Sequence, residues 1–286
     1  MTPTLVRQHR THTGAHPRVD RDARARDWSE IQERMLVPLY EAVYERLEVG
    51  PGTRLLGLGC GSGLALLMAA ARGATLTGVE TTHPERLALA RQRLQAEPPG
   101  PHARVDARLL DGPPQDAVGP RTPPYDLVTA FDLVGCAGGD PERLAGLLSA
   151  ALPLAEHGTA VVLTGWGPPE RCATSAVLRV AVELADPLPG GTGSRHTSRR
   201  DDLEDIARRA GLRPDGSGRV ACPFGYADTD SAVRGLLSTG LFDAAVAATD
   251  PAQVDKELTE ALHPHRRPDG TVWMPNVFRY LIARVP

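Results

Sequence analysis

Arg54-Leu-Leu-Gly-Leu-Gly-Cys-Gly-Ser-Gly63 is the stretch that decides the fold of this 286-residue chain. A short apolar run meets Gly59, Gly61 and Gly63, and an apolar, alanine-rich segment follows. This pattern predicts a buried strand, a glycine turn and the first turn of a helix. The glycines let the backbone turn sharply and approach a ligand, because no Cβ stands in the way. We therefore expect a cofactor loop with the spacing G-x-G-x-G, since Leu64 occupies the position that G-x-G-x-x-G would give to glycine.

A second apolar run, Ala74-Thr-Leu-Thr-Gly-Val-Glu80, ends in a carboxylate. In nucleotide-binding α/β folds, a carboxylate at the tip of the second strand accepts hydrogen bonds from a ribose diol. The glycine loop and Glu80 together point to a cofactor that carries adenosine.

Through these two segments, Asp111 and Tyr125-Asp-Leu-Val-Thr-Ala-Phe131, the sequence resembles the class I S-adenosylmethionine-dependent methyltransferases over about residues 28–166. A weaker similarity returns at 278–284. The resemblance implies an α/β fold with a Rossmann-like seven-stranded sheet in the order 3-2-1-4-5-7-6. Its last strand would be antiparallel, with helices on both faces and a helical lid. It also implies S-adenosylmethionine as the cofactor.

The resemblance assigns site residues as well. Cofactor contacts are expected from Gly59, Cys60, Gly61, Ser62, Gly63, Glu80, Thr81, Asp111 and Phe131. Substrate contacts are expected from Trp28, Tyr40, Asp132 and Trp166. Asp132 and Trp166 follow strands whose carboxyl ends form the ligand-binding edge of an open sheet. No single catalytic residue is assigned, because methyl transfer is mostly alignment, and no metal site is expected.

Residues 1–27 are polar, rich in arginine and histidine, and without apolar periodicity, which predicts a flexible N-terminal arm. His9-Arg-Thr-His12 resembles the end of a zinc finger, but no cysteine precedes it, so a disordered tail is the better interpretation. Residues 28–286 then form a methyltransferase-like domain, with substrate or lid additions at about 167–215 and 226–270.

Several element boundaries can be predicted from local signals. The first helix should begin near Ser29, with Gln32 completing a capping box, and Pro38 should kink it. A sixth strand is expected at 219–224 and a single helical pattern at about 230–248.

Composition limits the classes of partner. A formal net charge of −3 gives no reason to expect nucleic acid or an anionic membrane. The four cysteines are far apart in the chain and form no C-x-x-C pair, which argues against a zinc site and against a disulfide framework, so a reducing cytoplasm fits best. No apolar run reaches the length of a membrane span. The sequence leaves open whether the chain forms a homodimer.

Gly57 is the main departure from the resembling family, which usually places an acidic residue there to help hold the cofactor's amino group. A hydrogen bond to a charged group contributes about 1.5–3 kcal/mol. Glycine here could mean compensation elsewhere, looser binding, a different use of the pocket, or a backbone conformation that needs glycine.

Three functions follow from these patterns. The favoured one is methyl transfer to a small molecule in specialised (natural-product) metabolism. The alternatives are a methyltransferase-fold enzyme that does not methylate, such as a cyclase- or decarboxylase-like relative, and a non-catalytic auxiliary or binding protein. A short-chain dehydrogenase would need a tyrosine four residues before a lysine, but the only lysine is Lys256 and position 252 is Ala252.

Overall fold

The structure is a computed structural model that describes residues 20–95, 107–117, 119, 123–134, 140–185 and 202–286. A seven-stranded sheet has the order β3-β2-β1-β4-β5-β9-β6. Its strands are β1 Arg54–Leu58, β2 Thr75–Val79, β3 Ala107–Leu110, β4 Tyr125–Val134, β5 Ala155–Trp166, β6 Arg213–Ala221 and β9 Val277–Arg284. Only β9 is antiparallel to its neighbours, β5 and β6. The predicted strand order and the reversed last strand are confirmed, with β9 as the seventh strand of this sheet.

Helices cover both faces of the sheet, as expected of a doubly wound α/β fold. One face packs against α2 Val37–Arg46, α3 Leu64–Ala70 and α4 Pro84–Gln95. The other packs against α5 Asp140–Ala151 and α7 Asp202–Arg209. Each helix buries an apolar stripe, such as Leu39 and Val43 of α2 and Leu144 and Leu148 of α5.

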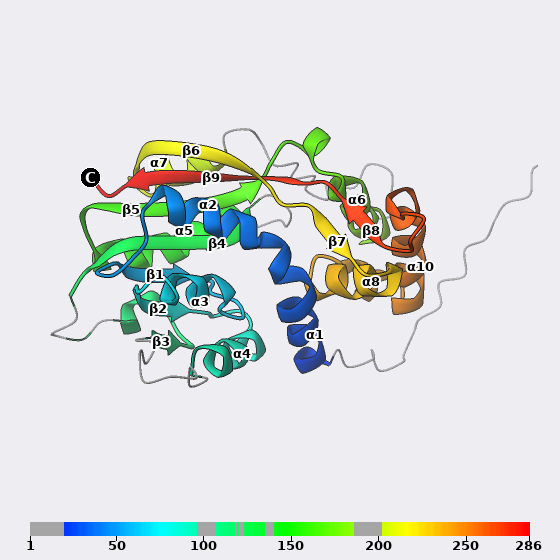
Figure 1. Cartoon of the computed structure of the whole chain (residues 1–286), viewed down its shortest axis with the longest axis horizontal. Coiled ribbons are helices and arrows are strands. Elements are labelled where there is room, and N and C mark those ends of the chain that lie inside the picture. Colours follow the sequence, from blue (N-terminus) through cyan, green and yellow to red (C-terminus); the bar gives the residue numbers. More distant parts are fainter. Residues whose placement is uncertain (1–19, 96–106, 118, 120–122, 135–139, 186–201) are drawn as a thin grey trace, which may run out of the picture.

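A second group of elements, which we call the helical lobe, lies beyond the ends toward which the parallel strands point (Figure 1). It consists of α6 Thr174–Ala185, α8 Thr229–Ser238, α9 Asp243–Ala248, α10 Pro251–Leu262 and the hairpin of β7 Phe224–Tyr226 with β8 Val272–Met274. Buried side chains of the lobe, among them Val177, Leu236 and Val254, belong to the same apolar core as Leu39 and Leu66 beside the sheet. The lobe is therefore fastened to the sheet by a continuous core.

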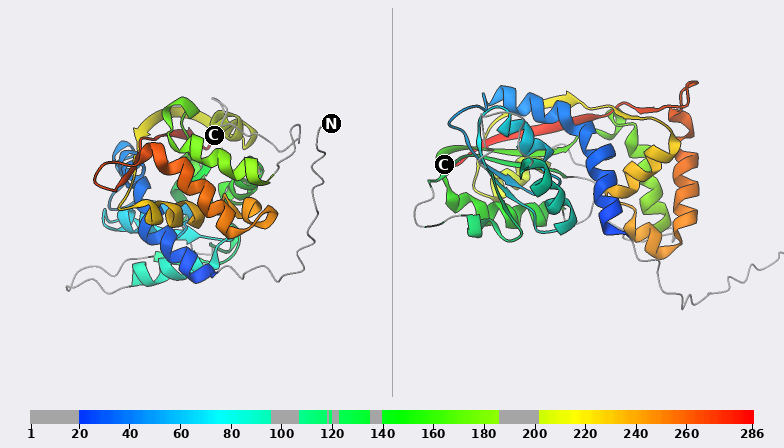
Figure 2. Two further views of the ribbon diagram at one scale, coloured as in Figure 1. Left: turned by 90° about the vertical axis from the view of Figure 1, so that its right-hand side faces the viewer. Right: turned by 60° about the horizontal axis from the view of Figure 1, so that its bottom comes forward.

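The N-terminal arm ends earlier than predicted. Arg21–Asp27 form helix α1, capped by Asp20, whose carboxylate accepts from the Ala23 N–H at 3.0 Å. Helix α1 lies between the sheet and the helical lobe and packs on α4 and α8 (Figure 2). The prediction of a flexible arm is therefore wrong for residues 21–27, because tertiary contacts stabilise a helix that lacks its own apolar periodicity. Residues 1–19 lie outside the described residues.

The predicted helix start at Ser29 is also wrong, since Ser29 lies inside a continuous helical run. A π-helical turn, Trp28–Gln32, follows α1, and a 3-10 turn, Glu33–Leu36, leads into α2. Pro38 stands in the first turn of α2. Because proline cannot donate a backbone hydrogen bond, regular α geometry changes just before it. The expected kink thus takes the form of two short turns of different pitch.

Three further boundaries differ from the sequence prediction. The sixth strand is β6, which ends at Ala221. Residue Phe224, predicted to be the end of this strand, instead begins β7 in the separate hairpin. The pattern at 230–248 forms two helices, since Gly240 adopts a positive φ of 87° between them. The predicted lid segment 167–215 includes α7, which packs on the sheet instead of the lobe. The loop at 187–196 lies outside the described residues.

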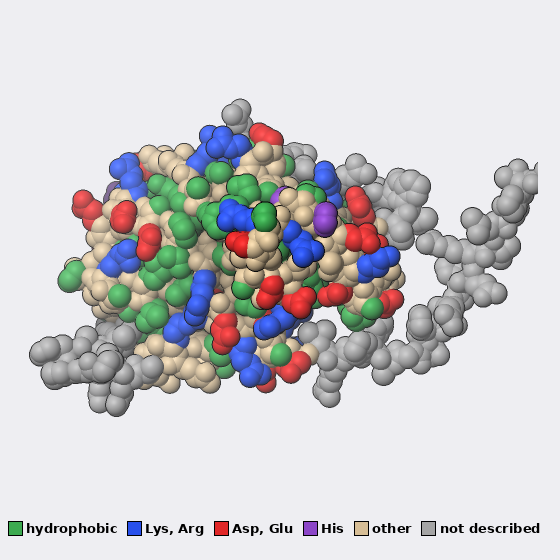
Figure 3. Space-filling model, turned by 45° about the vertical axis from the view of Figure 1, so that its right-hand side comes forward, with side chains coloured by type: hydrophobic (Ala, Val, Ile, Leu, Met, Phe, Trp, Pro, Cys, Tyr) green, Lys and Arg blue, Asp and Glu red, His purple; other side chains and the backbone are tan. Residues whose placement is uncertain are grey.

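The surface of the lobe side shows basic and acidic side chains intermixed (Figure 3). Within the described part of the chain, no helix combines the length and the apolar character that crossing a membrane requires.

Candidate cofactor and substrate site

The glycine loop between β1 and α3 has the conformation that its sequence requires. Gly59, Gly61 and Gly63 have φ values of 62°, 55° and 79°, a region that other residues rarely adopt. The Cys60 N–H donates to the Val79 carbonyl at 3.0 Å, which joins the loop to the end of β2. A Cβ at Gly63 would lie 2.9 Å from the Cβ of Ala90, so this glycine allows α4 to pack closely.

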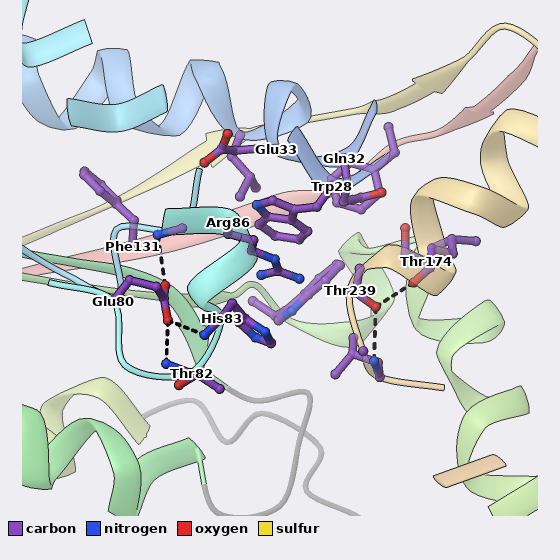
Figure 4. Close-up of a pocket in the computed structure, with 18 of the residues that line it drawn as sticks. Trp28, Gln32, Glu33, Glu80, Thr82, His83, Arg86, Phe131, Thr174 and Thr239 are labelled. Atoms are coloured by element: carbon purple, nitrogen blue, oxygen red, sulfur yellow. Dashed lines mark hydrogen bonds between the residues drawn. The ribbon is translucent and has the colours of Figure 1, made fainter. Parts of the chain in front are cut away.

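Glu80 follows β2 directly and is 4% exposed. Its Oε2 accepts from the Gly61 N–H at 3.1 Å, and its Oε1 accepts from the N–H groups of Thr82 and His83 at 2.8 and 3.1 Å (Figure 4). A carboxylate offers about four acceptor positions. Glu80 therefore holds the glycine loop and the loop after β2 together and keeps acceptor capacity for a ligand hydroxyl.

A second carboxylate, that of Glu33, reaches the glycine loop from the N-terminal helical run. Its side chain is 4% exposed, and Oε2 accepts from the Ser62 hydroxyl and from Nη1 of Arg93, the latter at 2.9 Å. Arg93 also donates to the Ser62 carbonyl at 2.9 Å and to the Ser29 hydroxyl. This network fixes the helical run over the loop, because the buried charges are paired and hydrogen-bonded.

Trp28 lies next to Glu33 and is held by an arginine. The guanidinium of Arg86 lies 4.1 Å from the centroid of the Trp28 ring, within the range of a cation–π contact. Arg86 also donates to the Ser238 carbonyl at 2.8 Å, which connects α4 with α8 of the lobe. The indole is thus placed by Arg86 of α4, which α8 holds in turn.

A pocket of about 330 Å³ opens above the glycine loop and extends between the sheet edge and the helical lobe. In Figure 4, Trp28, Gln32 and Glu33 lie along one side, Glu80, Thr82 and His83 along another, and Thr174 and Thr239 toward the lobe. The apolar lining is contributed by Leu36, Tyr40, Phe131, Trp166, Leu178, Phe224, Leu236 and Leu241. The size and the mostly apolar wall with a few polar groups are typical of small-molecule sites.

Aromatic contacts order this wall. The rings of Tyr40 and Phe131 have centroids 4.7 Å apart, and those of Trp166 and Phe224 are 5.9 Å apart. Burial raises the pKa of Tyr40 well above its usual value, and the negative charge of Glu33 raises that pKa further. The Tyr40 hydroxyl therefore stays protonated at neutral pH and serves as a hydrogen-bond donor or acceptor, not as a base.

The structure brings together seven of the residues that the sequence singled out. Gly59, Gly61, Glu80, Phe131, Trp28, Tyr40 and Trp166 all line the pocket. Cys60, Ser62 and Gly63 belong to the loop without lining the pocket, and the Ser62 hydroxyl binds Glu33 instead. Thr81 and Asp111 are exposed and outside the lining. Asp132 lies in β4, but its side chain is outside the described part of the structure.

Sequence reasoning missed Gln32, Glu33, Thr82, His83 and Arg86, which line the pocket. Thr82 and His83 could have been suspected from their position directly after Glu80. Glu33 and Arg86 carry no local signal, because each is a charged residue in a helical pattern, where solvent exposure is the usual outcome. The lobe residues of the lining, such as Thr174 and Thr239, come from segments with no motif.

Comparison with known proteins agrees with this geometry. Residues 56–158 match a family model described as a methyltransferase domain. This match includes the glycine loop, Glu80 and β4, and it confirms the resemblance to class I methyltransferases that the sequence suggested. A search of curated protein sequences finds no significant match.

Solved structures share the fold at low sequence identity. A candidate methyltransferase from Bacillus halodurans C-125 is 15% identical, with a TM-score of 0.51 over 86% of this chain and 98% of that one. The YjhP protein from E. coli is 18% identical, with a TM-score of 0.52 over 92% and 99% of the two chains. The YcgJ protein from Bacillus subtilis is 14% identical, with a TM-score of 0.50 over 86% and 98%. These similarities establish the Rossmann-like methyltransferase fold.

Proposed function

We propose that this chain transfers a methyl group from S-adenosylmethionine to a small molecule. The observation that carries the proposal is a single pocket that begins at the glycine loop and Glu80 and continues into an apolar chamber under the helical lobe. A methyltransferase needs both parts in one cavity, because the methyl donor and the acceptor must be in line and in contact.

The first part of the pocket suits an adenosine-bearing cofactor. Glu80 retains acceptor capacity at Oε2, where a ribose hydroxyl can donate, and Gly59 and Gly61 present bare backbone at the cavity wall. When bound, the cofactor supplies an electrophilic methyl group on a positively charged sulfur. The chain's own task is to bind, orient and exclude water.

The second part suits an apolar or aromatic acceptor of modest size. Phe131, Tyr40 and Trp166 line the pocket from the sheet and α2, and Leu178, Leu236 and Leu241 line it from the lobe. The Thr174 and Thr239 side chains offer a few polar contacts for orientation. This lining supports a small-molecule substrate, and we place the reaction in specialised metabolism on that ground. A cytoplasmic location remains a prediction from the cysteine pattern.

The proposal is tested by cofactor binding followed by methyl transfer. Calorimetry should detect binding of S-adenosylmethionine and S-adenosylhomocysteine. The chain with S-adenosylmethionine bearing a labelled methyl group should then label members of a panel of small phenols, amines and carboxylic acids. An absence of cofactor binding contradicts the proposal. Tight binding without transfer to any acceptor would favour the alternative of an enzyme on this scaffold that does not methylate, or of an auxiliary protein.

A pair of glycine variants provides the control. Gly61→Ala adds a Cβ at the pocket wall, 3.4 Å from Oε1 of Glu33, at a backbone φ of 55°. Gly158→Ala adds one at a φ of 82°, at the opposite edge of the sheet, with no atom within 4 Å. Both variants suffer similar backbone strain, but only the Cβ at position 61 lies at the pocket wall. Gly61→Ala should therefore reduce cofactor affinity, and Gly158→Ala should not. Equal effects on affinity would mean that the loop does not contact the cofactor.

A further inference from the structure

The pocket wall beside Gly61 carries an acceptor and a donor that the chain itself does not use. A Cβ added at Gly61 would lie 3.4 Å from Oε1 of Glu33 and 3.6 Å from Nε1 of Trp28. Both polar atoms therefore lie within 3.6 Å of one point above the loop backbone. Both residues line the pocket, and Figure 4 shows them coming from the same helical run.

Glu33 is held in place through one oxygen only. Its Oε2 accepts from Ser62 and Arg93. Its Oε1 has no hydrogen-bond partner within the described part of the chain. A nearly buried carboxylate is most stable when both oxygens are bound to donors or cations. The open oxygen therefore favours a positively charged group in the pocket.

Trp28 presents the complementary chemistry. Its Nε1 is buried and has no hydrogen-bond partner among the residues that the structure describes. An indole nitrogen can only donate, and leaving it unpaired in a buried place is unfavourable. Arg86 holds the ring from one face, with 4.1 Å from its guanidinium to the ring centroid. The open N–H therefore favours an acceptor on a ligand.

We propose that Glu33 Oε1 and Trp28 Nε1 form a subsite for an α-amino-acid head, the terminal group of the sulfonium cofactor. Glu33 receives the ammonium, and the Trp28 N–H donates to the carboxylate. An amino-acid head carries these two groups on one carbon, which matches a donor and an acceptor that face one point. The inference rests on the proposed function, because the same pocket must bind the adenosine part.

This subsite also accounts for the missing acid in β1. A Cβ at Gly57 would lie 2.9 Å from Cδ2 of Leu66, so position 57 is filled by the packing of α3 on the strand. The carboxylate is supplied instead by Glu33, from a helical run that precedes β1 in the chain. The loss of charge at one position is thus offset by another element.

The test compares ligands with and without the amino-acid head. S-adenosylhomocysteine has both head groups, decarboxylated S-adenosylmethionine has only the ammonium, and 5′-methylthioadenosine has neither. By calorimetry, Glu33→Gln should weaken S-adenosylhomocysteine binding by about tenfold or more. It should also weaken the binding of decarboxylated S-adenosylmethionine and leave the affinity for 5′-methylthioadenosine unchanged. Glu30→Gln is the matched control, since Glu30 is an exposed carboxylate in the π-helical turn just before Glu33, and it should change none of the three affinities.

Trp28→Phe is the second variant, because it keeps an aromatic ring under Arg86 and leaves the Glu33–Arg93–Ser62 network in place. It should weaken the binding of S-adenosylhomocysteine severalfold and leave the affinities for the two ligands without a carboxylate unchanged. This variant keeps the test decisive if Glu33→Gln proves too unstable to measure.

The outcomes separate the inference from the proposed function. If wild type binds neither S-adenosylhomocysteine nor 5′-methylthioadenosine, both are overturned. If wild type binds both ligands, but the variants reduce the affinities for all ligands equally or for none, the subsite assignment is wrong and the proposed function stands. Selective loss of the ligands that carry the head groups supports the subsite.

Discussion

Gly57 and Gly78 pair with each other in β1 and β2 and together make room for one leucine. A Cβ at Gly57 would lie 2.9 Å from Leu66, and one at Gly78 would lie 2.5 Å from the same side chain. Neither glycine has a positive φ, so the requirement is space and not backbone conformation. The absence of an acid at position 57 is therefore a packing feature of α3 on the sheet.

Gly57→Ala should lower the free energy of unfolding by about 1–3 kcal/mol, because it overpacks a filled core. Gly57→Asp should destabilise more, since it adds a charge at the same place. Urea unfolding measures both effects. The double variant Gly57→Ala with Leu66→Ala provides the control, because removing the leucine should abolish the clash. A strictly additive loss in the double variant would contradict this account.

Glu80 is the residue whose removal should affect both stability and binding. Glu80→Ala leaves the N–H groups of Gly61, Thr82 and His83 without their acceptor. We expect a loss of about 1–3 kcal/mol in the free energy of unfolding and at least severalfold weaker binding of S-adenosylhomocysteine, measured by urea unfolding and calorimetry.

Asp111→Asn provides the comparison for Glu80. The resemblance predicts an adenine contact for Asp111, yet this side chain is exposed and outside the pocket lining. We therefore expect a smaller loss of affinity for Asp111→Asn than for Glu80→Ala. An unchanged dissociation constant in Glu80→Ala would rule out the ribose contact.

At the scale of elements, the helical run before β1 is joined to the lobe by a close approach. A Cβ at Gly235 of α8 would lie 2.9 Å from Ile31 and 3.2 Å from Oε1 of Gln32. The Tyr226 hydroxyl of β7 donates to the same Gln32 oxygen at 2.9 Å. These contacts explain why the π-helical turn persists, since non-regular turns are held by tertiary partners. The π-helical turn contains Trp28 and leads directly into the 3-10 turn that begins with Glu33, so it positions both side chains.

Tyr226→Phe tests this coupling. Gln32 is 3% exposed, so loss of the Tyr226 hydroxyl leaves a buried acceptor without its donor. The free energy of unfolding should fall by about 1–3 kcal/mol, as measured by urea denaturation. Tyr280→Phe is the matched control, because the structure gives its hydroxyl no hydrogen bond among the described residues. If both variants lose the same stability, the Gln32 contact contributes nothing specific.

At the scale of the whole molecule, α1 connects the two parts that enclose the pocket. Arg24 pairs with Asp243 of α9 at 2.7 Å, Asp27 pairs with Arg234 of α8, and Arg21 lies 3.6 Å from Glu85 of α4. Exposed ion pairs contribute little singly. Here they accompany the buried Ala25 and a capped helix, so their combined effect is to fix the lobe relative to α4.

A pair of truncations measures the contribution of α1. A chain that begins at Asp20 keeps the cap and the helix, whereas a chain that begins at Trp28 follows the boundary predicted from sequence. The shorter chain should be less stable by about 1–3 kcal/mol, since it loses the cap and several ion pairs. It should also bind S-adenosylhomocysteine more weakly, because Trp28 would lie at a frayed terminus. Equal melting temperatures and affinities would show that α1 is dispensable.

The sequence by itself determined the glycine loop and the place of Glu80, and the strand order was expected from its resemblance to a known family. These features depend on local signals: apolar runs of strand length, glycines at positions that need a positive φ, and a carboxylate directly after a strand. A parallel sheet follows from the alternation of strands and helices, with ligands at its carboxyl edge. The reversed last strand was expected only from the resemblance.

Only the tertiary structure decided the rest of the site. Glu33 and Arg86 look like solvent-facing charges in their own helices, and they become pocket residues because α8 and α4 pack against the helical run. Gly57 is required for a leucine nine residues further on, which no strand pattern reveals. The helical lobe carries no motif, since its contribution is a packed apolar wall. Such a wall depends on which distant segments meet, and that information exists only in the folded chain.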